Sequence, residues 1–229
     1  MALNLDTFKI RSLSAVIYVI VMLTGLMFSQ WSFRLLFILI QFGCVVEFIR
    51  LIQRIDPGFI KFPFPVLKYL GLGFLYLSLP FSLLRDLYQH SPKYFTGPNW
   101  VFPMIIIVSI WINDTMAYIV GSLIGKTPLS PVSPKKTWEG TIGGAILAVL
   151  TVTIAGKLIL GFNIQYLILV SVTSAIAGTL GDLLESKIKR LANVKDSGQL
   201  MPGHGGFLDR FDSLLVAIPA VWLVFSLFL

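Results

Sequence analysis

The segment IQYLILVSVTSAIAGTLGDLLESKIKR, residues 164–190, indicates the fold class of this chain. From Ile164 to Gly181 it carries no charged residue, and this run approaches the roughly 20 apolar residues that a helix needs to cross a ~30 Å hydrocarbon core. From Asp182 onward, acidic and basic residues crowd together. The segment therefore predicts a transmembrane helix with a charged end.

The composition of the whole chain also indicates a membrane protein. Of its 229 residues, 56% are hydrophobic and only 13% are charged, and the mean hydropathy is +0.84. These values exclude an ordinary soluble domain and predict an all-α, polytopic bundle of about seven transmembrane helices. The predicted spans lie near residues 12–30, 32–49, 66–84, 101–123, 140–161, 164–183 and 211–229. We expect an N-terminal transmembrane region of about three spans over residues 1–100 and a catalytic transmembrane region over 101–229.

The basic residues are distributed unequally between the two sides of this arrangement. With the N-terminus in the cytosol, all but four of the 18 Lys and Arg residues fall on the cytosolic side. The exceptions are Arg34, Arg85, Lys93 and Lys157. Positive charge is typical of cytoplasmic loops, so we expect a protein of the cell (inner) membrane with its polar motifs facing the cytosol. The net charge of +7 then fits loops that face anionic lipid headgroups or a phosphorylated substrate, and no nucleic-acid partner is expected.

Two predicted helices carry acidic residues at the same membrane surface. Asp182 and Ser186 share one helix face, and Asp209 and Asp212 share another, because residues three or four apart are neighbours on a helix. Clustered carboxylates near the apolar zone are costly unless a cation neutralises them, and Asp oxygens together with substrate phosphates suit Mg²⁺. The alternative is a set of interfacial salt bridges to the neighbouring cations, which are Lys187, Lys189, Arg190 and Arg210.

Between these helices lies the segment KDSGQLMPGHGGFLD, residues 195–209. Gly205 and Gly206 permit a backbone to approach a ligand closely, as phosphate-binding loops require. A tight turn between two helices would need the same residues. His204 is a candidate phosphate donor, base or loop-stapling residue.

A second loop on the same side contains SPKKT, residues 133–137. Ser133 followed by Pro134 predicts the start of a helix, whose free N–H groups attract anions. Lys135 and Lys136 in its first turn oppose the helix dipole. A phosphate bound between them and contact with anionic lipid explain their presence equally well.

Asn113 and Asp114 lie about midway through the fourth predicted span. An ionisable residue inside a membrane is a functional hypothesis by default. The alternative is a packing hydrogen bond within the bundle.

Together, these residues resemble the signature of the phosphatidate cytidylyltransferases, also called CDP-diacylglycerol synthases. In the polar segment the matching residues are Ser186, Lys189, Arg190, Lys195, Asp196, Pro202, His204, Gly205, Gly206, Asp209, Arg210, Phe211 and Asp212. Upstream they are Asn113, Asp114, Thr115, Ala117, Tyr118, Gly121, Gly125, Lys126, SPKKTWEG (residues 133–140), Gly143 and Gly144. The resemblance covers the chain from about residue 101 onward, and the first hundred residues carry little of the pattern.

The resemblance implies transfer of the cytidylyl group of CTP to phosphatidate, giving CDP-diacylglycerol and diphosphate. It implies that Asp182, Asp209 and Asp212 hold one or two Mg²⁺ ions. The catalytic group that it implies consists of Ser186, Lys189, Arg190, Lys195, Asp196 and His204. The substrate-binding residues that it implies are Lys135, Lys136, Asn113, Asp114, Gly205, Gly206 and Arg210. The expected partners are CTP, phosphatidate and membrane lipids, and a homodimer is left open.

Three other functions compete with this interpretation. A CDP-archaeol synthase would use CTP on another lipid. A polyprenol kinase would transfer the γ-phosphate to a hydroxyl and would need a base, whereas an ionised phosphatidate needs none. A transporter would place polar residues along a path through several spans, whereas here they gather at the predicted cytosolic ends.

Overall fold

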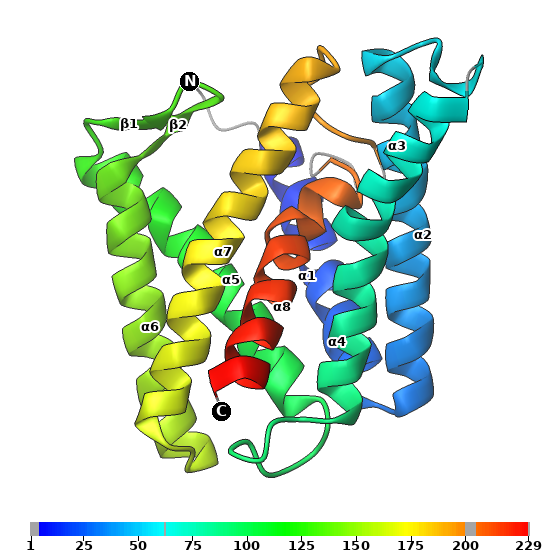
Figure 1. Ribbon diagram of the computed structural model, residues 1–229. Coiled ribbons are helices and arrows are strands. Elements are labelled where there is room, and N and C mark those ends of the chain that lie inside the picture. The colour runs from blue at the N-terminus through cyan, green and yellow to red at the C-terminus, as the bar shows by residue number, and fades with distance from the viewer. Residues whose placement is uncertain (1–4, 62, 200–204, 229) are drawn as a thin grey trace. The chain divides into compact units, whose positions relative to one another are not determined.

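The computed structural model of the protein describes residues 5–61, 63–199 and 205–228, and these are nearly all helical (Figure 1). The elements of the N-terminal part are α1 (Leu5–Met27), α2 (Gln30–Ile55), a 3₁₀ turn η1 (Phe59–Lys61), α3 (Pro63–Gly73), a π-helical turn η2 (Phe74–Ser78) and α4 (Leu79–Gln89). They are followed by α5 (Val101–Ile124), strands β1 (Pro128–Ser130) and β2 (Ser133–Thr137), α6 (Trp138–Leu160), α7 (Ile164–Leu191) and α8 (Leu208–Phe228).

Six helices among the described residues are long and apolar enough to cross a membrane. They are α2, the continuous segment Pro63–Gln89, α5, α6, α7 and α8, with mean hydropathies from 1.4 to 2.3 in their most apolar stretches. Residues Ser14–Met27 of α1 form a shorter apolar helix. The predicted all-α membrane fold is confirmed, with seven as an approximate helix count, and the chain is an integral membrane protein.

The chain divides into two compact units. The first consists of residues 1–78 and 188–211, and the second of residues 79–187 and 212–229. The boundary predicted near residue 100 separates the part of the chain that carries the sequence motifs from the part that does not. It stays a prediction. Each unit is described separately below.

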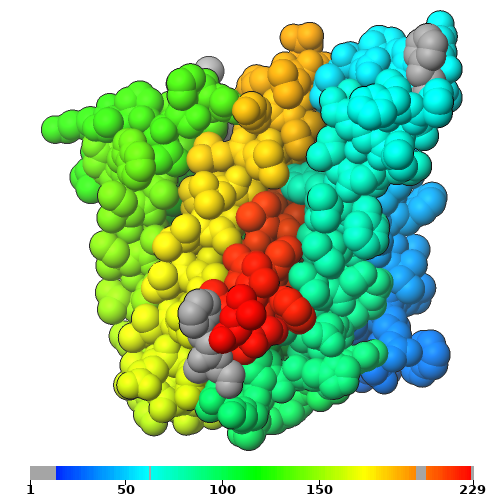
Figure 2. All heavy atoms as spheres, viewed as in Figure 1, coloured from blue at the N-terminus to red at the C-terminus, as the bar shows by residue number. Residues whose placement is uncertain are grey.

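In the second unit, α5 and α6 pack against each other through glycines. A Cβ added to Gly144 would lie 2.6 Å from the backbone nitrogen of Ala117, and one added to Gly140 would lie 2.6 Å from the carbonyl oxygen of Ala117. Small residues at such positions let two helix backbones approach closely. In Figure 2 the hairpin formed by β1 and β2 (green) lies at one end of α6 (yellow-green).

The predicted helix start at Ser133 and Pro134 is wrong. Residues Ser133–Thr137 form strand β2, which pairs antiparallel with β1 through Ser130↔Ser133 and Pro128↔Thr137. Helix α6 begins at Trp138, and the Thr137 hydroxyl caps it by accepting a hydrogen bond from the Gly140 N–H at 3.1 Å. In β2 the backbone N–H and C=O groups pair with β1 and are not available for a helix. The helix therefore begins later, and the next hydroxyl residue along the chain, Thr137, caps it.

In the first unit, α2 presents a buried face that is aromatic and aliphatic except at one position. Ser29 caps the helix by accepting from the Ser32 N–H at 3.0 Å, and Ser32 reciprocates. The buried apolar residues are Phe33, Phe37, Ile40, Cys44, Phe48, Leu51 and Ile52. Glu47 lies on the same buried face and is only 5% exposed, so its carboxylate must be satisfied inside the protein.

Candidate functional site

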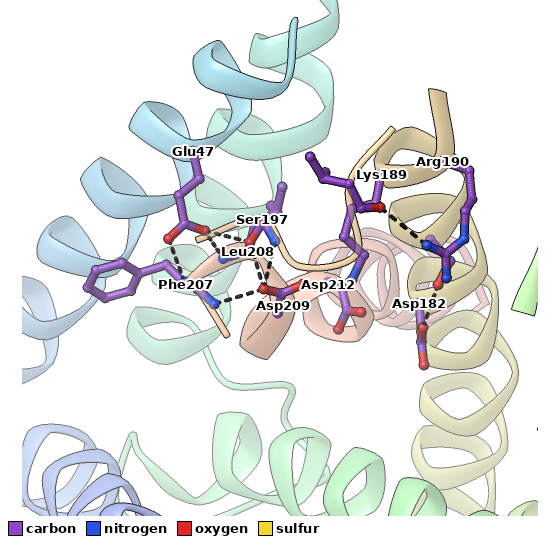
Figure 3. A network of polar contacts seen from close by, with 12 residues as sticks. Glu47, Asp182, Lys189, Arg190, Ser197, Phe207, Leu208, Asp209 and Asp212 are labelled. Atoms are coloured by element: carbon purple, nitrogen blue, oxygen red, sulfur yellow. Dashed lines mark hydrogen bonds and ion pairs between the residues drawn. The ribbon is translucent and has the colours of Figure 1, made fainter. Parts of the chain in front are cut away.

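Asp209, in the first turn of α8, lies at the centre of a buried polar network in the first unit (Figure 3). Its Oδ1 accepts a hydrogen bond from the Lys189 ammonium group at 2.6 Å. Its Oδ2 accepts from the Ser197 N–H at 2.9 Å, the Ser197 hydroxyl at 2.9 Å and the Gly206 N–H at 2.7 Å. The side chains of Lys189 and Asp209 are only 13% and 7% exposed, so this is a buried ion pair whose acidic member is also held by neutral donors.

The backbone around Asp209 has a shape that glycine provides. Gly205 has a φ of +81°, in the left-handed region where a side chain is strained. A Cβ at Gly205 would also lie 2.5 Å from Oδ2 of Asp209. The backbone at Gly205 and Gly206 therefore lies directly against the Asp209 carboxylate, and the predicted approach of this backbone to a ligand stays a prediction.

Glu47 extends this network from α2, and the sequence analysis did not identify it. Its carboxylate accepts hydrogen bonds from the Ser197 hydroxyl at 2.7 Å, the Phe207 N–H at 3.0 Å and the Leu208 N–H at 2.9 Å (Figure 3). The last two are N–H groups at the start of α8, which have no partner within the helix. An acidic residue inside the predicted span 32–49 was the available signal, because intramembrane acids are functional candidates.

In the second unit, Lys136 of strand β2 forms an ion pair with Asp182 of α7. Both side chains are 27% exposed. The Ser186 hydroxyl donates to the other oxygen of Asp182 at 3.3 Å, as the spacing of these two residues along the helix predicts. The hairpin thus brings a cation of the SPKKT motif to the acidic end of α7.

Helices α7 and α8 approach each other closely beside Asp182. A Cβ added to Gly181 would lie 2.5 Å from the carbonyl oxygen of Asp212. Asp212 is buried, and its Oδ1 accepts from the Ser213 N–H at 2.6 Å. The backbones of α7 and α8 therefore meet at Gly181 and Asp212.

Glu139 anchors the start of the hairpin to the first turn of α6. Its carboxylate accepts from the Thr127 hydroxyl at 2.8 Å and from the backbone N–H groups of Lys126 and Thr127 at 3.1 and 3.2 Å. The loop that carries Lys136 is thus fixed at its base.

Asn113 takes the part that the packing alternative predicted for it. It is 1% exposed, and its amide donates to the Thr179 hydroxyl of α7 at 3.4 Å. It also donates to Asp114 at 3.4 Å, and Asp114 is exposed. Asn113 therefore joins α5 to α7 inside the second unit, and a role of either residue in substrate binding stays a prediction.

The other predicted site residues are mostly at the surface. Lys135, Lys195, Asp196 and Arg210 are exposed. Arg190 is also exposed and donates to the carbonyl oxygen of Val194 at 3.2 Å. His204 lies outside the described residues.

Among the residues that the structure describes, no group of three or more His, Cys, Asp or Glu side chains is arranged to hold a metal ion. Asp182 and Asp209 instead point their oxygens at Lys136 and Lys189. Carboxylates of this kind are still the donors that Mg²⁺ prefers, so the residues present fit the ion chemically. Metal binding by Asp182, Asp209 and Asp212 stays a prediction.

The chain is similar to known proteins over most of its length. Residues 66–228 match the sequence profile of the Cytidylyltransferase family. The chain is 32% identical to a phosphatidate cytidylyltransferase of Rickettsia bellii over 229 residues, covering 96% of this chain and 91% of that protein. It is 40% identical to one of Staphylococcus epidermidis, covering 76% of this chain and 69% of that protein.

A phosphatidate cytidylyltransferase of Bacillus subtilis is 38% identical over 170 residues, which cover 73% of this chain and 61% of that protein's length. The family profile covers α7, the loop after it and the start of α8. These segments contribute residues to both polar groups. The chain belongs to the Cytidylyltransferase family.

Proposed function

We propose that this protein is a phosphatidate cytidylyltransferase, which converts CTP and phosphatidate into CDP-diacylglycerol and diphosphate. Family membership and the names of the three relatives support this activity. The observation that carries it furthest is the buried pair of Lys189 and Asp209, whose acid is held by the Ser197 hydroxyl and by the N–H groups of Ser197 and Gly206. Lys189 and Asp209 both lie in the polar segment, residues 186–212, whose residues resemble the family signature.

The reaction requires positioning and charge neutralisation more than proton transfer. A phosphate oxygen of phosphatidate attacks the α-phosphorus of CTP, a new P–O bond forms, and the bond to the β-phosphate oxygen breaks to release diphosphate. The attacking phosphate is already ionised near pH 7, so it needs no strong base. Orientation of the two substrates and preorganised positive charge then supply most of the rate enhancement.

Basic side chains near each polar group can supply that charge. In the second unit, Lys136 lies at the end of the anchored hairpin beside Asp182. In the first unit, Lys189 lies beside Asp209. Among the predicted site residues, the exposed cations that could bind CTP and lipid phosphates are Lys135, Arg190, Lys195 and Arg210.

Mg²⁺ is part of this proposal. Asp182, Asp209 and Asp212 would hold it, and the ion would neutralise charge on the departing diphosphate. The lysines now paired with Asp182 and Asp209 would then direct their ammonium groups at substrate phosphates. Lysine suits this use because it binds phosphate as a point charge on a flexible stem.

We place the active side of the protein in the cytosol, at the inner membrane of the cell. The excess of Lys and Arg in the loops that would face the cytosol supports this orientation, and CTP is a soluble cytosolic nucleotide. A phosphatidate headgroup in the same leaflet lies at the depth of the charged helix ends.

Diphosphate release by the purified protein tests the proposal. Mixed micelles would contain CTP, Mg²⁺ and one acceptor: phosphatidate, diacylglycerol or a polyprenol. We expect diphosphate only with phosphatidate, together with a CDP-lipid product identified by mass spectrometry. Formation of CDP and a phosphorylated lipid from a polyprenol would instead identify a kinase, and a folded protein inactive with every acceptor would refute the proposed activity.

A further inference from the structure

Glu47 lies against the two described parts of the loop that joins α7 to α8, residues 192–199 and 205–207. Its three hydrogen-bond donors are the Ser197 hydroxyl and the N–H groups of Phe207 and Leu208. These residues belong to the same compact unit as α2. A carboxylate that is 5% exposed and accepts two backbone N–H groups at the start of a helix is held firmly.

The surface of α2 and the loop fit each other around this carboxylate. A Cβ added to Gly198 or Gly206 would collide with the carboxylate oxygens of Glu47. One turn earlier on α2, a Cβ added to Gly43 would collide with the ring of Phe207. Glycines on both sides of the contact therefore allow the loop backbone to lie directly against Glu47.

Ser197 connects Glu47 to Asp209. Its hydroxyl oxygen lies 2.7 Å from Glu47 Oε2 and 2.9 Å from Asp209 Oδ2, and its N–H donates to Asp209. Consecutive backbone N–H groups are divided between the same two acids, with Gly206 donating to Asp209 and Phe207 donating to Glu47. A displacement of the Glu47 carboxylate would therefore shift the backbone that holds Asp209.

We propose that Glu47 is a positioning residue for cytidylyl transfer: it fixes the α7–α8 loop and, through Ser197, sets the place of Asp209 and its partner Lys189. This inference rests on the function proposed above. Misplacement of a reacting group by about 1 Å can cost a factor of about 10² in rate. An isosteric Glu47→Gln change puts an NH₂ group where a backbone N–H needs an acceptor, so we expect kcat to fall about tenfold to hundredfold. The KM for CTP should change less, because substrate can still bind to a displaced site.

Two measurements on the whole protein in detergent test this role. Hydrogen–deuterium exchange, which needs no activity, should become faster in peptides covering residues 205–208 in Glu47→Gln than in the wild type. Steady-state kinetics with CTP and phosphatidate should show the loss in kcat. Asp56→Asn is the matched control. It is the same acid-to-amide change directly after α2, where the Asp56 carboxylate accepts a hydrogen bond from the Tyr69 hydroxyl at 3.3 Å, and it should alter neither quantity.

A double-mutant cycle separates positioning from general destabilisation. If Glu47 acts through Ser197, the losses in kcat for Glu47→Gln and Ser197→Ala will not multiply. The kcat of the double variant will then be close to that of the less active single variant. Ser197→Ala also carries the test alone if Glu47→Gln cannot be recovered folded. It should lower kcat at least severalfold while the thermal unfolding midpoint changes little.

The possible results lead to different conclusions. Unchanged exchange at residues 205–208 would show that Glu47 does not hold the loop. Faster exchange with wild-type kcat, or losses that multiply, would show a purely structural role and overturn the proposal. An inactive wild-type protein would refute the proposed function and the catalytic part of this inference together, and the exchange experiment would still decide whether Glu47 holds the loop.

Discussion

Lys189 and Asp209 are 20 residues apart in the chain, and their Nζ and Oδ1 atoms lie 2.6 Å apart in a nearly buried ion pair. Removing one member of such a pair leaves an uncompensated buried charge, which costs roughly 3–5 kcal/mol. Removing both members costs much less. This pair therefore contributes to stability as well as to the proposed site.

A comparison of single and double variants should make this asymmetry visible. We expect Lys189→Met to lower the free energy of unfolding by about 3 kcal/mol or more. The double variant with Asp209→Asn, whose amide oxygen can still accept from the Ser197 and Gly206 N–H groups, should recover part of that loss. Activity should be absent in both variants. Thermal unfolding in detergent, with a diphosphate-release assay beside it, provides both readouts. Equal destabilisation of single and double variants would contradict the buried-pair assignment.

Gly205 and Gly161 form a matched pair for testing the turn at Asp209. Both have positive φ, +81° and +72°, so an alanine at either position costs about 1–2 kcal/mol of backbone strain. Only at Gly205 would the new Cβ meet Asp209, since nothing lies within 4 Å of a Cβ at Gly161. We expect a larger loss of stability in Gly205→Ala than in Gly161→Ala, and a large loss of kcat in Gly205→Ala alone. Equal kcat values in the two variants would separate this turn from the chemistry.

A further prediction concerns the crossing of α7 and α8 at Gly181. Gly181→Ala places a Cβ 2.5 Å from the carbonyl oxygen of Asp212, which is backbone and cannot rotate away, so the helices must separate and activity should fall. Gly178→Ala, one turn earlier on α7, meets only ordinary contacts at 3.5 Å. Its higher helix propensity should leave stability unchanged or raise it by up to about 1 kcal/mol. Thermal unfolding and kcat of the two variants, measured side by side, test the crossing.

Lys136 should matter more than another lysine on the same unit. Lys136→Gln removes the partner of Asp182 and a proposed phosphate ligand, so we expect kcat/KM for CTP to fall at least tenfold. Lys157, exposed in the last turn of α6, provides the control, and Lys157→Gln should keep the wild-type value. A wild-type value for Lys136→Gln as well would exclude the hairpin from substrate binding.

Removal of Mg²⁺ tests the proposed ligands. EDTA should abolish diphosphate release, and added Mg²⁺ should restore it. In Asp212→Asn, a weaker ligand should shift the activation curve to higher Mg²⁺ concentration while the fold is kept. A folded Asp209→Asn variant with full turnover at low Mg²⁺ would refute that residue's assignment as a ligand.

The helices could be predicted from the sequence because apolar length alone decides whether a segment can span a membrane. The run Ile164–Gly181 became part of α7, and the shared helix face of Asp182 and Ser186 followed from helical spacing. The predicted helix start at Ser133 and Pro134 was wrong because both residues are also compatible with an edge strand. Only the pairing of β2 with β1 decides between them, and that depends on a neighbouring segment.

The network around Asp209 was only partly predictable. Gly205, Gly206 and Asp209 were identified, and ion pairing with nearby cations was one of the two alternatives. Glu47 could not be connected to Ser197, 150 residues away, because no local pattern encodes a contact between distant segments. A lone acid in an apolar span marks a buried partner somewhere, and only the folded structure identifies that partner.

The glycine contact between α5 and α6 also bears on how the protein is made. The two helices are adjacent in the chain, joined by a short hairpin, and their backbones meet at Gly140 and Gly144. Contacts between neighbouring segments form early, because little chain has to be closed to make them. During synthesis this pair can therefore assemble in the membrane before α7 leaves the ribosome, so the part of α7 that belongs to the second unit is added to two helices that have already paired.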